Sequence, residues 1–144
     1  MCMDIDDEPM LKIRSRTDCP CGSKKMYFDC CRPYHIGKAQ PATAELLMRA
    51  RYSAFFFRLV DYLVSSTHPD VREKNLQEKL DNMVDTMLWR NLVILSKSKG
   101  TAEDKKGKVE FCAQYHCDGK FSEIEENSRF RKYKGQWKYV DDKG

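Results

Sequence analysis

Four cysteines near the amino terminus are the residues of this chain best suited to chemistry. They fall within thirteen residues, in the sequence Cys-Pro-Cys-Gly-Ser-Lys-Lys-Met-Tyr-Phe-Asp-Cys-Cys. Their thiols form two pairs, Cys19 with Cys21 and Cys30 with Cys31, on either side of an eight-residue loop. Two thiolate pairs from two short segments are typical of tetrahedral zinc coordination. We therefore predict a zinc site at these four residues.

Two alternatives to this ligand set stay open. A segment this short needs a metal or disulfides to hold its shape, so the four sulfurs are also candidates for disulfide formation. In addition, His35 lies four residues beyond Cys31 and is a second candidate for the fourth ligand. We favour Cys31, because Pro33 biases the chain toward a path that leads His35 away from the site. His35 is then expected to be an ordinary polar residue.

The spacing Cys-x-Cys-x8-Cys-Cys, with Gly22-Ser23 directly after the first pair, resembles the SEC-C motif. This small zinc unit is known from the carboxy-terminal tail of the SecA translocation ATPase. The family usually reads Gly-Ser-Gly after the first pair, whereas this chain has lysine at the second glycine position. The resemblance implies zinc as cofactor and protein partners at the motif. Because sulfurs occupy the inside, we expect three basic side chains to face outward and bind the partner: Lys24, Lys25 and Arg32.

Composition indicates a globular protein that is neither exported nor embedded in a membrane. The chain has 144 residues, 41% hydrophobic and 33% charged, and its net charge of +4 is too small to indicate nucleic acid by itself. The acidic first eight residues lack the pattern of a signal peptide, and the apolar run over 55–64 is too short for a bilayer. Seven cysteines, an odd number and clustered, favour a reducing compartment. We therefore expect a cytoplasmic protein with no membrane partner.

The chain divides into three parts by its hydrophobic periodicity. Residues 1–18 have none and are predicted to be a flexible lead-in, residues 19–36 form the zinc motif, and residues 37–144 form the main domain. Three helices are expected first. Thr43 is predicted to cap the first helix, whose apolar face holds Leu47, Ala50, Ala54 and Phe57. A short second helix is expected from near Asp61 to His68-Pro69. Asp70 is predicted to cap the third helix, whose apolar face holds Leu76, Leu80, Met83 or Val84, and Met87.

The second half of the domain alternates with the period of strands. We predict strands near 89–96, 108–117, 121–132 and 136–140, with Trp89, Val93 and Leu95 on one face of the first. Asp118-Gly119 and Lys134-Gly135 are hairpin turn sequences. Helices followed by an antiparallel meander predict an α+β fold.

Several segments of this domain are similar to the YchJ-like family of uncharacterised bacterial proteins. They include Met48-Arg49-Ala50-Arg51-Tyr52-Ser53-Ala54, Asp61-Tyr62-Leu63, His68-Pro69 and the final Gly135-Gln136-Trp137-Lys138-Tyr139-Val140-Asp141. The resemblance implies an amino-terminal SEC-C motif joined to a domain similar to nuclear transport factor 2. In such a domain, helices and a curved antiparallel sheet form a cone with an open end. The family's usual Gly-Asp between the first helices is Arg58-Leu59 here.

The cone offers a second candidate site. A pocket there is expected to involve Tyr52, His68, Trp89, Tyr115 and Trp137, with His68 as the candidate acid–base group. The sequence has no glycine-rich phosphate loop, no paired-carboxylate motif and no nucleophile signature, so we lean against an enzyme. Our first hypothesis is a zinc-binding adaptor that uses the cysteine unit to bind another protein. A small-molecule enzyme or carrier that uses the cone is the alternative, and an RNA-associated factor is a weaker one.

Overall fold

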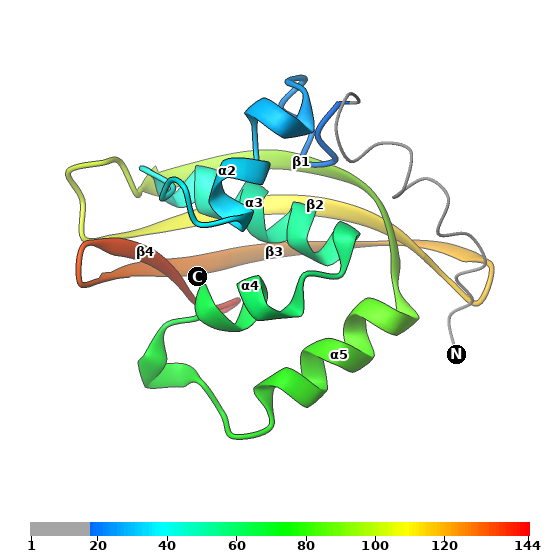
Figure 1. Cartoon of the computed structure of the whole chain (residues 1–144). Helices are drawn as coiled ribbons and strands as arrows, with labels where there is room; N and C mark the ends of the chain where they lie inside the picture. Colours follow the sequence, from blue (N-terminus) through cyan, green and yellow to red (C-terminus); the bar gives the residue numbers. More distant parts are fainter. Residues whose placement is uncertain (1–17) are drawn as a thin grey trace.

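The computed structural model describes residues 18–144, and all but the last residue of the predicted flexible lead-in lies outside this part. The helical elements are η1 (Tyr27–Asp29), α2 (Arg32–His35), α3 (Ala44–Phe57), α4 (Val60–Ser65), η2 (Pro69–Val71) and α5 (Leu76–Thr86). The strands are β1 (Leu88–Lys99), β2 (Lys106–Cys117), β3 (Lys120–Tyr133) and β4 (Gln136–Asp141). They form one antiparallel sheet in the order β1-β2-β3-β4, with α3, α4 and α5 on one face of it (Figure 1). The predicted α+β meander is confirmed.

Helix α3 begins as the sequence predicts. The Thr43 side chain accepts a hydrogen bond of 3.1 Å from the Leu46 backbone N–H, which satisfies one of the free donors at the helix start. The helix ends at Arg58, whose φ of 63° is left-handed. This conformation is costly for a residue other than glycine. Arg58 therefore adopts a glycine-like backbone at the position where the family usually has glycine.

The third helix does not begin where we expected. Asp70 lies in η2, and its carboxylate accepts a hydrogen bond of 2.9 Å from Arg131 on β3. Helix α5 starts six residues later, after Asn75. The prediction that Asp70 caps α5 is wrong, because this carboxylate has a partner across the fold. The predicted apolar face is present, with Leu80 and Val84 buried.

Strand β1 departs from simple alternation. Its pairing with β2 shifts register between Trp89 and Asn91 and again between Ile94 and Ser96. An extra residue at the first shift turns Trp89 and Leu92 to the same buried side. Val93 and Leu95, which we expected on the face of Trp89, are exposed. Alternation fails here because a bulge inserts a residue that pairs with none.

The two predicted hairpin turns are confirmed. Asp118 and Gly119 have φ angles of 55° and 78°, and Lys134 and Gly135 have 52° and 79°. Two consecutive left-handed residues make a turn whose twist matches that of the strands it joins. On β2, Val109, Phe111 and Ala113 are buried on the face that packs against the helices, as the alternation predicts.

The main core continues into the cysteine unit. Buried side chains of α3 and the sheet, among them Leu47, Ala50 and Phe57, pack in one cluster with Cys19, Cys21, Cys31 and Tyr27. The cysteine unit and the helix–sheet body therefore share a core. Within residues 18–144, no helix has both the length and the apolar character needed to cross a bilayer.

Candidate metal centre

The four cysteines converge on one point. Their sulfur atoms all lie within 4.8 Å of one another, with 3.7 Å between Cys21 and Cys30 and 3.9 Å between Cys30 and Cys31. Four sulfurs placed tetrahedrally around zinc at about 2.3 Å stand about 3.8 Å apart. A disulfide needs about 2.05 Å, so the sulfurs are spaced for a shared metal and not for disulfides. All four are free thiols.

A tight turn after the first cysteine pair sets this geometry. The Cys19 backbone N–H donates to the Lys25 carbonyl over 2.7 Å, and the N–H of Gly22 donates to the Cys19 carbonyl over 3.3 Å. Gly22 and Lys24 both have left-handed backbones, with φ of 81° and 69°. Lys24 therefore has a backbone conformation that favours glycine, at the position where the SEC-C motif usually has glycine. The loss of that glycine leaves the turn intact and adds strain to it.

Side chains from the loop and from α3 contact the cysteines. The Ser53 hydroxyl, fully buried on α3, lies 3.3 Å from the sulfurs of Cys19 and Cys31. Ser23 lies 3.1 Å from the Cys30 sulfur, and Arg49 donates to the Cys21 carbonyl over 2.6 Å. Hydrogen bonds of this kind orient metal ligands. The sequence does not predict these contacts, because two of them arise only from the packing of α3 against the loop.

His35 lies outside the sulfur cluster. Its Nδ1 is 2.8 Å from the Tyr27 hydroxyl, and its Nε2 is 2.8 Å from the Ala50 carbonyl on α3. Both ring nitrogens are therefore engaged elsewhere, and burial lowers the pKa of the ring. The prediction that Pro33 leads His35 away from the cysteines agrees with this geometry. His35 is nevertheless more than an ordinary polar residue, since it fastens the unit to α3.

The sulfurs strongly affect one another's protonation. Hydrogen bonds from the neighbouring thiols, Cys19 first, lower the pKa of Cys30 to about 7, and they lower the pKa of Cys21 further. Contacts with the same sulfurs raise the pKa of Cys19 and Cys31, and burial adds to this rise. Four thiolates this close repel one another unless a cation lies among them. The cluster is thus suited to a soft divalent metal that displaces the thiol protons.

The outer surface of the unit combines basic and apolar side chains. Lys24 and Lys25 are exposed, as expected. Phe28 is 50% exposed, and the Arg32 guanidinium lies 4.9 Å from the centre of its ring. Met26, two residues before Phe28 in the chain, is also exposed. This surface is defined here as the basic–aromatic patch, residues Lys24, Lys25, Met26, Phe28 and Arg32.

A cavity of about 380 Å³ lies between the helices and the inner face of the sheet. Of the five residues predicted to form a cone pocket, Tyr52 and Trp89 line it. Their ring centres are 6.0 Å apart in an edge-to-face arrangement. The Tyr52 hydroxyl, the Trp89 indole N–H and the Ser128 hydroxyl are buried without a hydrogen-bond partner, and all three residues line this cavity.

The other three predicted pocket residues do not line this cavity. His68 is buried and its Nδ1 accepts the Asp70 backbone N–H over 3.1 Å, so it caps the 3-10 turn η2. Tyr115 packs against the Trp89 ring at 5.3 Å. Trp137 donates from its indole N–H to the Ala42 carbonyl over 3.1 Å. Of the predicted pocket, this cavity therefore brings together Tyr52 and Trp89.

Glu126 is a cavity residue that the sequence analysis did not identify. It lies on β3 between Ile124 and Ser128 on the same face, and burial raises the pKa of its carboxyl group. Its sequence neighbours Glu125 and Asn127 lie on the opposite face of the strand. Alternation along β3 would have pointed to Glu126 had the register been known.

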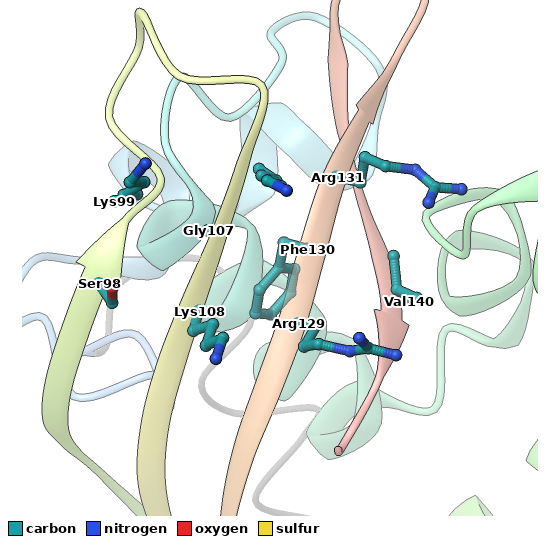
Figure 2. Close-up of a pocket in the computed structure, with 9 residues that line it drawn as sticks. Ser98, Lys99, Gly107, Lys108, Arg129, Phe130, Arg131 and Val140 are labelled. Carbon is teal, nitrogen blue, oxygen red and sulfur yellow. The ribbon is translucent and has the colours of Figure 1, made fainter. Parts of the chain in front are cut away.

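A second cavity, of about 400 Å³, has a basic lining (Figure 2). Lys106 and Lys108 on β2 are exposed while Val109 is buried, so these lysines lie on the outer face of the sheet. Two arginines of β3 in the lining have acidic partners: Arg129 bonds to Asp141 and Arg131 bonds to Asp70. The lining comprises Ser98, Lys99, Lys106, Gly107, Lys108, Arg129, Phe130, Arg131 and Val140.

A curved antiparallel sheet with helices on one face, joined to a four-cysteine unit, defines a SEC-C motif protein with a domain similar to nuclear transport factor 2. The family model described as the YchJ middle domain, similar to nuclear transport factor 2, matches residues 43–142. The chain therefore belongs to the YchJ-like family.

Relatives share both parts of the chain. A UPF0225 protein of Vibrio parahaemolyticus is 38% identical over 125 residues, which cover 87% of this chain and 74% of the relative. A UPF0225 protein of Sodalis glossinidius is also 38% identical, over 128 residues that cover 88% of this chain and 82% of the relative.

Two solved structures share the fold. A SEC-C motif containing protein from Rhodopseudomonas palustris is 30% identical with a TM-score of 0.77, over 87% of this chain and 96% of that one. A SEC-C motif containing protein from Psychrobacter arcticus is 27% identical with a TM-score of 0.74, over 93% of this chain and 84% of that one.

Proposed function

We propose that the chain is a zinc-binding adaptor whose cysteine unit holds one structural zinc ion and presents a surface to a protein partner. The observation that carries the metal assignment is the sulfur spacing of 3.7 and 3.9 Å, which fits a tetrahedral zinc site. Four sulfur ligands leave no open position for a substrate, and this is typical of structural sites and not of catalytic ones. Zinc would offset two of the four thiolate charges and fix the loop without taking part in a reaction.

Native mass spectrometry of the whole chain tests the metal. We expect one zinc ion per chain, its loss in Cys31→Ser, and its retention in His35→Ala. Metal analysis of the same samples distinguishes zinc from iron, which thiolate sites also bind. A chain purified without metal but with an ordered cysteine unit would contradict the proposal. Zinc loss in His35→Ala and not in Cys31→Ser would reassign the fourth ligand.

The basic–aromatic patch supports the adaptor role. Exposed lysines in the same loop as a half-exposed phenylalanine offer both charge attraction and apolar contact to an acidic protein surface. The zinc unit would present this surface in one fixed shape, so little conformational entropy would be lost on binding. Arg32 is already stacked on Phe28, which favours a preorganised patch.

Two charge-reversed double variants provide matched tests of this surface. Lys24→Glu/Lys25→Glu alters the patch, and Lys106→Glu/Lys108→Glu alters the outer face of the sheet with the same change in net charge. We expect partner proteins captured from the source cell extract to be lost in the first variant and kept in the second, with capture weakening as salt rises. Equal capture by both variants would remove the adaptor proposal.

The basic cavity supports the weaker alternative, an RNA-associated factor. Its lysines, Lys99, Lys106 and Lys108, have the charge and the exposure to contact phosphates. The same two variants distinguish this function. Single-stranded RNA binding that is lost in Lys106→Glu/Lys108→Glu, and kept in the patch variant, would favour RNA over a protein partner. The small-molecule alternative depends on the cavity between the helices and the sheet.

A further inference from the structure

We infer that the outer face of the sheet binds the same face of a second copy of this chain. The two β3 strands run antiparallel across this interface, and Asn127 lies at the two-fold axis between them. The outer face is the one away from helices α3, α4 and α5 (Figure 1). The inference goes beyond the adaptor proposal and does not depend on the zinc centre.

The order of side chains along β3 is the main evidence. Ser128 and Phe130 are buried against the helices, so every second residue on the other side of the strand points to the outer face. All of these outward residues except the central asparagine are exposed. In chain order they are Phe121, Glu123, Glu125, Asn127, Arg129, Arg131 and Tyr133. The series has an aromatic residue at each end, two acids before the centre and two arginines after it, so it is complementary to its own reverse.

A two-fold axis that crosses β3 at Asn127 brings these complementary residues together. The rotation reverses the strand direction, so each residue faces the one at the same distance on the other side of Asn127. Two sheets stacked face to face keep their strands within about 30° of each other, so long side chains reach across. The pairs between the two copies are Glu125 with Arg129, Glu123 with Arg131, and Phe121 with Tyr133, and each pair forms twice.

Strand β2 has the same order of charge. Lys106 and Lys108 are level with the two arginines of β3, whereas the residues level with Glu123 and Glu125 are uncharged. The outer face therefore has a basic end, which Figure 2 shows, and an acidic end. Glu110 is level with Asn127 and would approach its own copy near the axis, but Lys108 of each chain lies two residues away and offsets the repulsion.

The facing charges are available for these pairs. Arg129 bonds to Asp141 and Arg131 bonds to Asp70, yet the two arginine side chains are 46% and 45% exposed. A guanidinium has five N–H donors, so each arginine can bind a second carboxylate. Within residues 18–144, Glu123 and Glu125 are exposed and have no ion pair. A second copy would supply the cations that these two carboxylates lack.

The outer face is also large enough for a stable dimer. Four strands about 4.8 Å apart, with ladders of up to twelve residues at about 3.4 Å each, cover about 700 Å². Specific protein interfaces bury about 800 Å² of each partner. Val93 on β1 and Phe121 on β3 are 46% and 56% exposed on this face, so the interface includes apolar contact as well as charge.

Charge reversal on β3 tests the interface in the zinc-loaded full chain. Glu123→Arg/Glu125→Arg places arginines opposite arginines in the dimer. Glu78→Arg/Asp81→Arg makes the same change in net charge on the exposed side of α5 and is the matched control. Sedimentation velocity over a series of chain concentrations measures the dimer dissociation constant. We expect a dimer for the original chain and the control, and a dissociation constant at least about tenfold higher for the β3 variant. Higher salt should weaken the original dimer.

A mixture of two reversed variants tests the two-fold arrangement. Arg129→Glu/Arg131→Glu should not form a dimer by itself, because acids then face acids. Mixed with Glu123→Arg/Glu125→Arg, it should form a heterodimer, since each end again meets the opposite charge. Circular dichroism reports whether each variant folds. If loss of the bonds to Asp141 and Asp70 prevents folding, Lys106→Glu/Lys108→Glu takes its place in the mixture.

Four results would overturn the inference: an original chain that is monomeric at every concentration, a dimer that the β3 variant keeps, equal weakening in the α5 control, or a mixture of folded variants that forms no heterodimer. Equal weakening in the control would show that net charge and not this face is responsible. Native mass spectrometry of the same samples counts the zinc ions separately, so failure of the interface is distinct from failure of the metal centre.

Discussion

The cysteine unit, residues 19–36, and the four-stranded sheet hold their shapes by different means. The sheet has antiparallel ladders of up to twelve paired residues between β2 and β3 and buries its own apolar face. The unit has one 3-10 turn and a four-residue helix, and it relies on its sulfurs and on contacts from Ser53, Arg49 and the Ala50 carbonyl. The difference teaches that a segment too small for a core of its own can extend the core of its neighbour.

Removal of the unit should have the largest effect. From sequence, a chain that begins at Gly37 is expected to unfold cooperatively by itself. Because Tyr27 and three cysteines belong to the main core, we now expect such a chain to lose about 3–5 kcal/mol of stability, as when large side chains are removed from a core. Chemical denaturation followed by circular dichroism measures the loss.

A chain that begins at Asp18 is the control for this truncation, because it keeps the whole unit. Its free energy of unfolding is the reference value for the chain that begins at Gly37. An unchanged free energy of unfolding for the chain beginning at Gly37 would show that the two regions are independent and that the shared core contributes little.

Substitution of His35 tests the contact between the cysteine unit and α3 with a single side chain. His35→Ala removes the contacts to Tyr27 and Ala50 and leaves buried groups unpaired, which should cost about 1–3 kcal/mol of stability. Zinc should stay bound, since His35 is outside the sulfur cluster. Thermal unfolding and metal analysis of one sample measure the stability and the zinc content. The control is Gln40→Ala, because Gln40 is exposed and lies five residues after His35.

Ser53 links α3 to the sulfurs, so its removal should weaken the metal site itself. Ser53→Ala eliminates hydrogen bonds to Cys19 and Cys31, and we expect zinc affinity to fall about 10–100-fold, as for other residues that orient metal ligands. Competition with a coloured chelator measures the affinity. Ser65→Ala, exposed at the end of α4, should bind zinc like the original chain. Equal affinities for all three proteins would show that α3 does not support the site.

The smallest expected effect is a gain in stability. Lys24→Gly relieves the left-handed backbone at φ 69° and should stabilise the zinc-bound chain by about 1 kcal/mol. Lys25→Gly is the matched control, since Lys25 does not have a positive φ and gains nothing from glycine. Unfolding midpoints compare the two. An equal gain in stability for Lys25→Gly, or no gain for either variant, would mean that the backbone at Lys24 is not strained.

Local chemistry accounts for what the sequence could predict. The cysteine spacing, the Thr43 cap and the Asp118-Gly119 turn each involve residues close together in the chain, and all three agree with the structure. The fold class follows from the order of helical and alternating segments.

Contacts between distant segments account for the features that the sequence could not predict. Asp70 bonds to Arg131 instead of capping α5, and His35 bonds to Ala50, because packing brings those partners together. The bulge in β1 is invisible to an alternation pattern, so the cavity residues were predicted only in part. Ser128 and Glu126 were missed for a related reason, since polar residues on one strand do not reveal which face of it is covered.

Helix α3 is a wall common to both candidate sites. Arg49 and Ser53 contact the cysteine unit, while Tyr52 and Phe55 line the cavity from the same helix. A ligand in the cavity that shifts this helix would also move Ser53 relative to the sulfurs. By thermodynamic linkage, any change that such a ligand makes in the affinity for zinc is matched by an equal change that zinc makes in the affinity for the ligand. A ligand that shifts helix α3 would in this way make its own occupancy depend on the metal supply.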